Sequence, residues 1–342
     1  MSAGTVLVTG ASGFIAKHCI AELLRRDFAV KGTLRDMNRA DAVRKSVARA
    51  GADASGVDFV SADLLRDDGW GRAMEGCTYV MHIASPFPLR EPRDPDEVIR
   101  PAREGVLRVL KAATQAGVKR VVMTSSVVAV TLPWPEAPQG RVFTEADWTN
   151  PERPDITTYI RSKALAERAA WEFLKSEPRA PELATVNPAI VLGPATDTDI
   201  STSHEVIRMM AKRAYPAAPR VGFPISDVRD VAATHALAMT KTEAAGKRFL
   251  TANGFMRLVE VGQVLADTLP DLKGKVPRRE LRDITVRIVA LFDKRLKAVL
   301  PDLGHPRPIS NAQARTVLGQ SFRSAQEAVR SAALSLRELG VI

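Results

Sequence analysis

The chain has little cysteine, and neither of its thiols lies in a metal-binding pattern. Cys19 and Cys77 are the only two cysteines among 342 residues, and no Cys-x-x-Cys motif or Cys/His cluster surrounds either of them. Disulfide scaffolds and zinc centres need several such residues at defined spacings. We therefore expect two buried free thiols and no metal site.

A long hydrophobic run is also missing. No apolar stretch approaches the roughly 18 to 20 residues of a membrane-spanning helix, and the sequence enters a predicted strand at residue 5, too early for a signal peptide. Hydrophobic residues make up 45% and charged residues 26% of the chain, which is typical of a globular protein. We therefore expect a cytoplasmic protein without a membrane partner.

The chain is basic but contains no block of basic residues. Its net charge is +10, from 49 Lys and Arg against 39 Asp and Glu, and the two signs are mixed, as in residues 278–283. Surfaces that bind nucleic acid usually cluster their cations and interleave them with aromatic residues. We expect no nucleic-acid partner, although a positive field attracts anionic cofactors and substrates.

The first two-thirds of the chain alternates short β-rich runs with helical patterns. Strands are predicted at residues 5–9, 29–34, 57–60, 79–83, 120–124 and 183–187, and helices near residues 13–26, 39–50, 67–75, 96–116 and 157–177. Such alternation is typical of parallel strands joined by crossover helices. It predicts an α/β fold with a doubly wound parallel sheet, a Rossmann fold.

The pattern loosens after residue 190, where helices near residues 229–240, 257–268 and 324–339 dominate. We predict a Rossmann domain at residues 1–190 that carries the nucleotide site and the catalytic residues. Residues 191–342 are predicted to form mainly a smaller C-terminal substrate lobe, interleaved with the last Rossmann elements at about residues 221–255. An amphipathic stretch at residues 287–300 is either a lid or an interface helix, and the sequence does not distinguish the two.

A glycine-rich turn follows the first predicted strand. The sequence from Gly10 through Gly13 to Ala16 has the spacing Gly-x-x-Gly-x-x-Ala, where the commoner nucleotide-binding motif is Gly-x-Gly-x-x-Gly. Glycines permit the tight turn from strand to helix, and free amides at the helix N-terminus can hold a pyrophosphate. This context favours a dinucleotide site over an ordinary turn.

The end of the second predicted strand favours NADP over NAD. An acidic residue there would bind the ribose 2′-hydroxyl and repel a 2′-phosphate, whereas this chain has Arg35. The planar guanidinium can pair with the phosphate. The alternative is that Arg35 and the adjacent Asp36 are simply solvated loop charges.

Tyr159 and Lys163 lie four residues apart in a predicted helix and therefore share one of its faces. We expect the ammonium group to lower the pKa of the phenol, which would suit it for proton transfer near neutral pH. Alone, this spacing occurs by chance in many chains, so its meaning depends on the nucleotide-binding turn.

Together these motifs make the chain resemble the extended short-chain dehydrogenase/reductase family. More narrowly, it is similar to the branch with dihydroflavonol reductases, cinnamoyl-CoA reductases and microbial carbonyl reductases. The resemblance extends to about residue 255 and rests on motifs at residues 8–15, 33–36, 62–64, 82–86, 122–126, 159–163, 187–194 and 225–232. It implies NADPH-dependent interconversion of an aldehyde or ketone and an alcohol.

The resemblance implies roles for individual residues. Ser126, Tyr159 and Lys163 would be catalytic, with Ser125 the alternative to Ser126 if the register slips by one. Without the family, Asp63 is explained equally well as a helix cap. The predicted cofactor-binding residues are Gly10, Ser12, Gly13, Phe14, Ile15, Arg35, Asp63, Leu64, Ala84, Ser85, Thr124, Tyr159, Lys163, Pro188, Val191 and Ser203.

The substrate is left open by departures from the family pattern. Thr131 stands where dihydroflavonol reductases place a substrate-gripping asparagine, and residues 155–159 lack the signature of cinnamoyl-CoA reductases. We predict a small carbonyl or alcohol partner, apolar or aromatic, and a monomer or homodimer. Candidates for the pocket lining, which could equally be plain core, are Phe87, Val127, Thr131, Leu132, Trp134, Met209, Tyr215 and Phe223.

Two other functions remain open at this point. A sugar-nucleotide epimerase or dehydratase of the same fold would hold NAD tightly and regenerate it, and Arg35 argues against this. A dinucleotide-sensing regulator without turnover would not need the tyrosine, lysine and serine.

Overall fold

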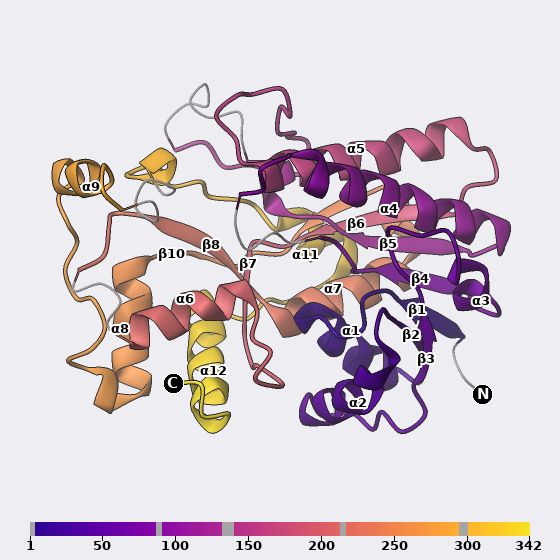
Figure 1. The fold of residues 1–342 in the computed structure, drawn as a ribbon, viewed down its shortest axis with the longest axis horizontal. Coiled ribbons are helices and arrows are strands. Elements are labelled where there is room, and N and C mark those ends of the chain that lie inside the picture. Colours follow the sequence, from indigo (N-terminus) through magenta and orange to yellow (C-terminus); the bar gives the residue numbers. More distant parts are fainter. Residues whose placement is uncertain (1–3, 87–90, 132–139, 213–216, 294–299) are drawn as a thin grey trace.

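The structure is a computed structural model that describes residues 4–86, 91–131, 140–212, 217–293 and 300–342. Its centre is a seven-stranded parallel sheet with the strand order β3-β2-β1-β4-β5-β6-β9 (Figure 1). The strands are β1 (Thr5–Val8), β2 (Ala29–Leu34), β3 (Asp58–Ser61), β4 (Tyr79–His82), β5 (Arg120–Thr124), β6 (Glu182–Asn187) and β9 (Arg248–Leu250). The predicted doubly wound α/β fold is therefore confirmed.

Helices cover both faces of this sheet (Figure 1). One face packs against α3 (Trp70–Met74), α4 (Asp96–Gln115) and α5 (Thr158–Ser176). The other packs against α1 (Phe14–Leu24), α2 (Ala40–Arg49), α7 (Val228–Thr240) and α11 (Ala312–Leu318). Because helices lie on both sides, the central strands are shielded on both faces, and all five residues of β5 are buried.

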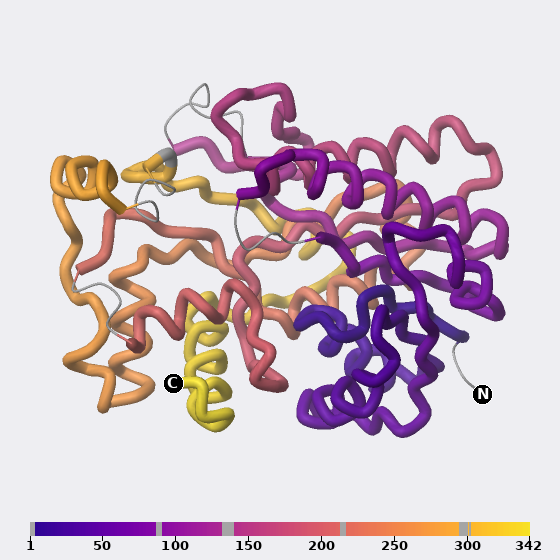
Figure 2. The backbone as a smooth tube through the Cα atoms, in the orientation of Figure 1, coloured from indigo at the N-terminus to yellow at the C-terminus, as the bar shows by residue number. Residues whose placement is uncertain are grey.

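A second, smaller group of elements packs beside the carboxyl ends of the main sheet. It contains the three-stranded sheet β10-β8-β7, formed by β10 (Phe255–Arg257), β8 (Gly222–Asp227) and β7 (Ile190–Leu192). Its helices are α6 (Thr202–Ala211), α8 (Leu258–Thr268), α9 (Asp283–Val289) and α12 (Ala325–Glu338). Figure 2 shows the last helix returning to this group near the C-terminus, where it packs on α8 around a shared apolar core.

The chain passes between the two groups of elements more than once. After β7 and β8, α7 returns to pack on α1, and β9 adds the last strand of the main sheet beside β6. The division at residue 190 remains a prediction. Within the predicted amphipathic stretch 287–300, α9 ends at Val289, and residues 294–299 lie outside the described residues.

A buried arginine ties the central strands to α7. Arg120, which is 2% exposed at the start of β5, forms an ion pair with Glu182 of β6 at 2.6 Å. It also donates hydrogen bonds to the carbonyls of Ala238 and Met239 at 3.0 and 3.1 Å, which satisfies acceptors in the last turn of α7. These contacts hold the first residue of β5 in place, and β5 leads to the candidate site.

Cys19 and Cys77 are buried free thiols, as expected. None of the helices in the described part of the chain has the length and apolar character needed to cross a membrane.

Candidate active site

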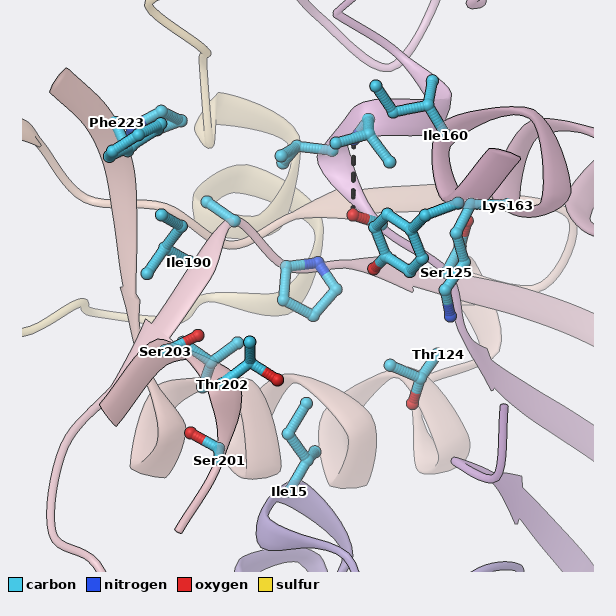
Figure 3. Close-up of a pocket in the computed structure, with 18 of the residues that line it drawn as sticks. Ile15, Thr124, Ser125, Ile160, Lys163, Ile190, Ser201, Thr202, Ser203 and Phe223 are labelled. Carbon is cyan, nitrogen blue, oxygen red and sulfur yellow. Dashed lines mark hydrogen bonds between the residues drawn. The ribbon is translucent and has the colours of Figure 1, made fainter. Parts of the chain in front are cut away.

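A cavity of about 630 Å³ opens where the carboxyl ends of the central strands meet the smaller group of elements. Doubly wound sheets bind their ligands at this edge. The lining includes the β1–α1 turn, residues at the ends of β4 and β5, the start of α5, and parts of β7, α6 and β8. Figure 3 shows Thr124 and Lys163 on one side of the cavity and Ile190, Ser203 and Phe223 on the other.

Ser126 enters the cavity from the turn that follows β5. Its oxygen accepts a hydrogen bond from the amide of Val128 at 3.3 Å, which caps the short helix Val127–Ala129. Two backbone hydrogen bonds to the neighbouring strand segment, Ser125 N to Val186 O at 2.8 Å and Val127 N to Pro188 O at 2.9 Å, fix this turn on both sides.

Tyr159 and Lys163 enter from the first two turns of α5. The helix begins at Thr158, where Thr157 caps the amide of Ile160 at 3.3 Å. The Tyr159 side chain is hydrogen-bonded to Ser126, and the Lys163 ammonium lies 6.0 Å from the centre of the tyrosine ring. The structure thus brings together the three residues that were predicted to be catalytic.

Removal from water shifts the pKa values of both α5 residues. Burial raises the pKa of Tyr159 to about 12, although its hydrogen bond with Ser126 acts in the opposite direction. Burial lowers the pKa of Lys163 to about 8, and the negative charge of Glu167 opposes this shift. The net shift of the tyrosine pKa is therefore upward, against the expected lowering, because desolvation of the phenol outweighs the effect of the ammonium group at this distance.

Thr124, beside Lys163 in Figure 3, is oriented by a buried histidine. Its hydroxyl lies 2.7 Å from Nε2 of His235, whose Nδ1 lies 2.8 Å from the carbonyl of Val231. Since a carbonyl only accepts, Nδ1 carries the proton, and burial keeps the ring neutral by lowering its pKa to about 4. Thr124 therefore donates to Nε2, which leaves its oxygen as an acceptor.

The glycine turn lies at the base of the same cavity. Gly10 has φ +66°, and a Cβ there would lie 3.0 Å from the side chain of Ala84, so this close approach requires glycine. Gly13 precedes the first residue of α1, and no side chain caps its amides. Gly13, Phe14 and Ile15 line the cavity, whereas Gly10 and Ser12 shape the turn without lining it.

Arg35 lies at the end of β2, outside the cavity lining. Its side chain is exposed and forms no ion pair with a carboxylate of the described residues. The neighbouring Asp36 caps the turn to Asn38 by accepting its amide at 3.0 Å. The guanidinium of Arg35 is therefore available to an anionic ligand, while the carboxylate of Asp36 is held by its own loop.

Other predicted cofactor residues divide between the cavity and its surroundings. Asp63 caps a turn by accepting the amide of Leu65 at 3.0 Å, which agrees with the simpler explanation for this residue. The Ala84 amide donates to Thr9 at 3.0 Å beneath the glycine turn. Asp63, Leu64 and Ala84 are not part of the cavity lining, whereas Ser85, Thr124, Pro188, Val191 and Ser203 are.

Three of the predicted pocket residues line the cavity, namely Val127, Thr131 and Phe223. Met209 lies in α6 but does not line it. Phe87, Leu132, Trp134 and Tyr215 lie outside the described residues.

A buried carboxylate that was not predicted from the sequence lies beneath the site. Glu167 is 0% exposed and accepts hydrogen bonds from Ser125 at 2.5 Å, Asn187 at 2.8 Å and Thr185 at 3.0 Å. Arg248 pairs with it at 2.7 Å. Asn187 also donates to the carbonyl of Ser126 at 3.2 Å, so the network reaches the turn that carries Ser126.

This carboxylate is charged despite its burial. Desolvation would raise the pKa of Glu167, but Arg248 and the hydrogen bonds from Ser125 and Asn187 outweigh it and lower the pKa overall. The signal in the sequence was its position: Tyr159, Lys163 and Glu167 follow one another at intervals of four on a single helix face. A second group that was missed is formed by Asp302, His305 and Arg307, which line the cavity from the C-terminal part of the chain.

Comparisons with known proteins show which proteins this chain resembles. The profile of the NAD dependent epimerase/dehydratase family matches residues 6–251. Ketoreductase azaE of Aspergillus niger is 30% identical over 97% of both chains, and a cinnamoyl-CoA reductase of Medicago truncatula is 36% identical over 78% of this chain and 82% of its own.

Solved structures extend the similarity over nearly the whole chain. Gre2 from Candida albicans in complex with NADPH superposes with a TM-score of 0.81 at 27% identity, covering 98% of this chain and 99% of that one. Yeast methylglyoxal/isovaleraldehyde reductase Gre2 complexed with NADPH has the same TM-score and identity. The chain therefore belongs to the NAD dependent epimerase/dehydratase family, which is the extended short-chain dehydrogenase/reductase family that its motifs predicted, and its relatives include carbonyl reductases.

Proposed function

We propose that the protein reduces an aldehyde or ketone with NADPH and catalyses the reverse oxidation, using Ser126, Tyr159 and Lys163. The observation that carries this proposal is the hydrogen bond between Tyr159 and Ser126 inside a cavity that also holds Lys163 and the glycine turn. A proton donor and a nucleotide-binding turn in one cavity are the two components that carbonyl reduction needs.

The choice of NADPH is supported by the residues around the turn. The uncapped amides at the start of α1 suit a pyrophosphate, and the free guanidinium of Arg35 suits a 2′-phosphate. The relatives of known structure that contain NADPH, Gre2 of Candida albicans and of yeast, agree with this choice. When bound, NADPH supplies the hydride that reduces the carbonyl carbon.

The chain's own residues would hold the carbonyl and move the proton. Ser126 donates a hydrogen bond to the substrate oxygen, and Tyr159 protonates that oxygen as it becomes an alkoxide. A pKa of about 12 keeps the phenol protonated at neutral pH, and an alkoxide is basic enough to take its proton. The Lys163 ammonium stabilises the phenolate that remains and binds the ribose hydroxyls of the cofactor.

The cavity favours an aromatic or medium-chain apolar substrate. Besides the catalytic residues, its walls are formed largely by apolar side chains such as Val127, Ile160, Ile190 and Phe223. A sugar nucleotide would place many hydroxyl groups against these walls without partners. That mismatch, together with Arg35, disfavours an epimerase or dehydratase, and the intact Ser126, Tyr159 and Lys163 set disfavours a regulator without turnover.

Replacing the proton donor should abolish most of the turnover. Tyr159→Phe is expected to lower kcat at least about a hundredfold, because general acid catalysis contributes on the order of 10² to 10⁴ in rate, while NADPH binding is retained. Turnover is followed at 340 nm and binding by NADPH fluorescence. Tyr79→Phe, on β4 and packed against Phe28, is the matched control. Near-normal turnover of Tyr159→Phe would exclude this residue as the acid.

The cofactor preference should depend on Arg35. A charge-assisted hydrogen bond contributes about 1.5 to 3 kcal/mol, so we expect Arg35→Ser to lower kcat/KM for NADPH by roughly 10- to 100-fold and to leave the value for NADH unchanged. Arg66→Ser, at an exposed pair with Asp68, should change neither value. A wild-type preference for NADH would contradict the assignment.

The loss of activity at alkaline pH should follow the deprotonation of Lys163. Because its pKa is lowered to about 8, the charged form is present below that pH and is lost as the pH rises through it. We expect kcat/KM for NADPH, which reflects the free enzyme, to fall above about pH 8 toward a tenfold loss per pH unit. A profile that stays flat to pH 10 would show that the ammonium charge is not needed.

Removing the charge of Glu167 should shift the alkaline fall in kcat/KM to a different pH. Glu167→Gln keeps the shape of the side chain, but the Lys163 pKa should fall further, so the alkaline limb shifts to lower pH. Breaking the buried pair with Arg248 should also lower the free energy of unfolding by about 3 to 5 kcal/mol. Glu182→Gln, at the Arg120 pair, is the control for destabilisation alone. If the pH at which kcat/KM falls is the same in Glu167→Gln, then Glu167 has only a structural role.

A further inference from the structure

Apolar side chains are concentrated on the outside of α9 and of the turn that follows it. Nine large apolar side chains are exposed in the described part of the chain, and five of them fall within residues 284–292. These five are Ile284, Ile288, Val289, Leu291 and Phe292, and the last is 87% exposed. They do not line the cavity, so the proposed reaction does not use them.

Four of these side chains follow a helical period. Ile284, Ile288, Leu291 and Phe292 are spaced by four, three and one residues, which places them on one helix face. Backbone hydrogen bonds continue the helical turns beyond the end of α9, since the amide of Phe292 donates to the carbonyl of Val289 at 2.9 Å. The four residues therefore form one continuous row, which we call the apolar stripe.

The inner face of α9 is anchored in the core. Val286 is 0% and Ala290 4% exposed, and both belong to an apolar cluster that also contains Phe223 and Leu303. The helix therefore cannot turn the apolar stripe inward without unpacking these contacts. Figure 1 shows α9 at one end of the long axis of the molecule, away from the main sheet.

Exposed cations accompany the apolar stripe. One lies on α9 itself, and the segment that leads from α8 to α9 adds five more exposed Lys and Arg side chains. Figure 1 shows this segment along the same end of the molecule as α9. The six cations form no ion pair with a carboxylate of the described residues, and they are Lys273, Lys275, Arg278, Arg279, Arg282 and Arg287.

The acidic residues that interrupt this basic stretch are already paired. Glu280 lies 3.3 Å from Arg257, and Asp283 lies 2.6 Å from Arg220, so both pair with arginines from outside the stretch. The mixture of signs at residues 278–283 of the sequence therefore becomes an excess of positive charge in the folded protein. Protruding apolar side chains beside exposed cations suit the headgroup region of an anionic bilayer.

The other classes of partner fit this surface less well. Two copies of the chain that met through it would bring their cations face to face, and like charges in contact weaken association. Nucleic acid would match the cations but would place Ile284, Ile288 and Leu291 against its phosphates. A partner protein would need a groove shaped for the protruding stripe, whereas a bilayer accepts apolar side chains at any point of its surface.

We propose that the apolar stripe and the six cations bind the protein to the surface of anionic phospholipid membranes, with Leu291 and Phe292 inserted between the lipids. Peripheral binding of this kind needs no spanning helix. The proposal departs from the expectation of no membrane partner, which rested on the missing long apolar run. It does not depend on the proposed reaction.

The first test uses the unmodified protein and two kinds of large unilamellar vesicle, one of phosphatidylcholine alone and one of equimolar phosphatidylglycerol and phosphatidylcholine. Bound protein is measured by flotation. Each Lys or Arg near an anionic surface strengthens binding about fivefold, so we expect partitioning into the anionic vesicles to be at least about a hundredfold stronger and to weaken as salt is added. Equal partitioning into both vesicles, or none into either, would overturn the proposal.

The second test removes the most exposed part of the apolar stripe. Leu291→Gln combined with Phe292→Gln should weaken partitioning into the anionic vesicles at least about tenfold, because two large apolar side chains no longer leave water. The matched control is Leu65→Gln combined with Leu334→Gln, at two exposed leucines elsewhere, which should bind like the unmodified protein. Unchanged binding of the first pair would refute the role of the stripe.

The third test separates the local cations from the net charge. Replacing Arg278, Arg279 and Arg282 by Gln should weaken partitioning at least about tenfold. A control variant loses the same charge at three exposed positions elsewhere, through Arg72→Gln, Lys119→Gln and Arg330→Gln, and should lose far less. An equal loss in both variants would show that net charge alone attracts the protein, against the proposal.

A contact between proteins is the competing outcome. If the unmodified protein ignores vesicles but sediments as a dimer that dissociates in the Leu291→Gln, Phe292→Gln variant, the surface is a protein interface and the proposal fails. All substitutions lie at exposed positions, and the vesicle comparison with the unmodified protein decides even where a variant does not fold. NADPH turnover without vesicle binding would leave the proposed function standing.

Discussion

The site depends on one buried carboxylate. Glu167 is removed from water entirely, and its charge is tolerated because Arg248 and the side chains of Ser125, Thr185 and Asn187 all point their donors at it. Glu167 itself lies on α5, whereas these partners come from β6, β9 and the turn after β5. The network therefore fixes the helix that carries Tyr159 relative to the turn that carries Ser126. The proposed proton transfer depends on the distance between these two residues.

The same network reaches beyond the strands. Arg248 donates to the carbonyls of Glu145 and Asp147 at 2.8 and 2.7 Å, and its guanidinium lies 3.7 Å from the ring centre of Trp148. The segment between Ser126 and Tyr159 is thereby held on the sheet. A negative charge in this position also opposes the effect of burial on Lys163, so the same group contributes both geometry and electrostatics to the site.

The sequence predicted those features that local chemistry determines. The glycine turn, the strand and helix order, and the placement of Tyr159, Lys163 and Ser126 in one cavity follow from motifs whose spacing has a direct structural meaning. It could not predict the raised pKa of Tyr159, because that shift comes from the surrounding protein rather than from the neighbouring lysine. Glu167 was missed for a similar reason, since its partner Arg248 lies 81 positions later in the sequence.

In the proposed reaction, a carbonyl carbon receives hydride from NADPH while Tyr159 supplies the proton. The most direct measurement uses NADPH in which both hydrogens at C4 of the nicotinamide are replaced by deuterium, together with an apolar ketone and mass spectrometry of the alcohol. The account predicts one deuterium on the carbinol carbon of the alcohol for each NADPH consumed. An alcohol without deuterium, or purified protein that retains bound NAD and consumes no NADPH, would contradict it.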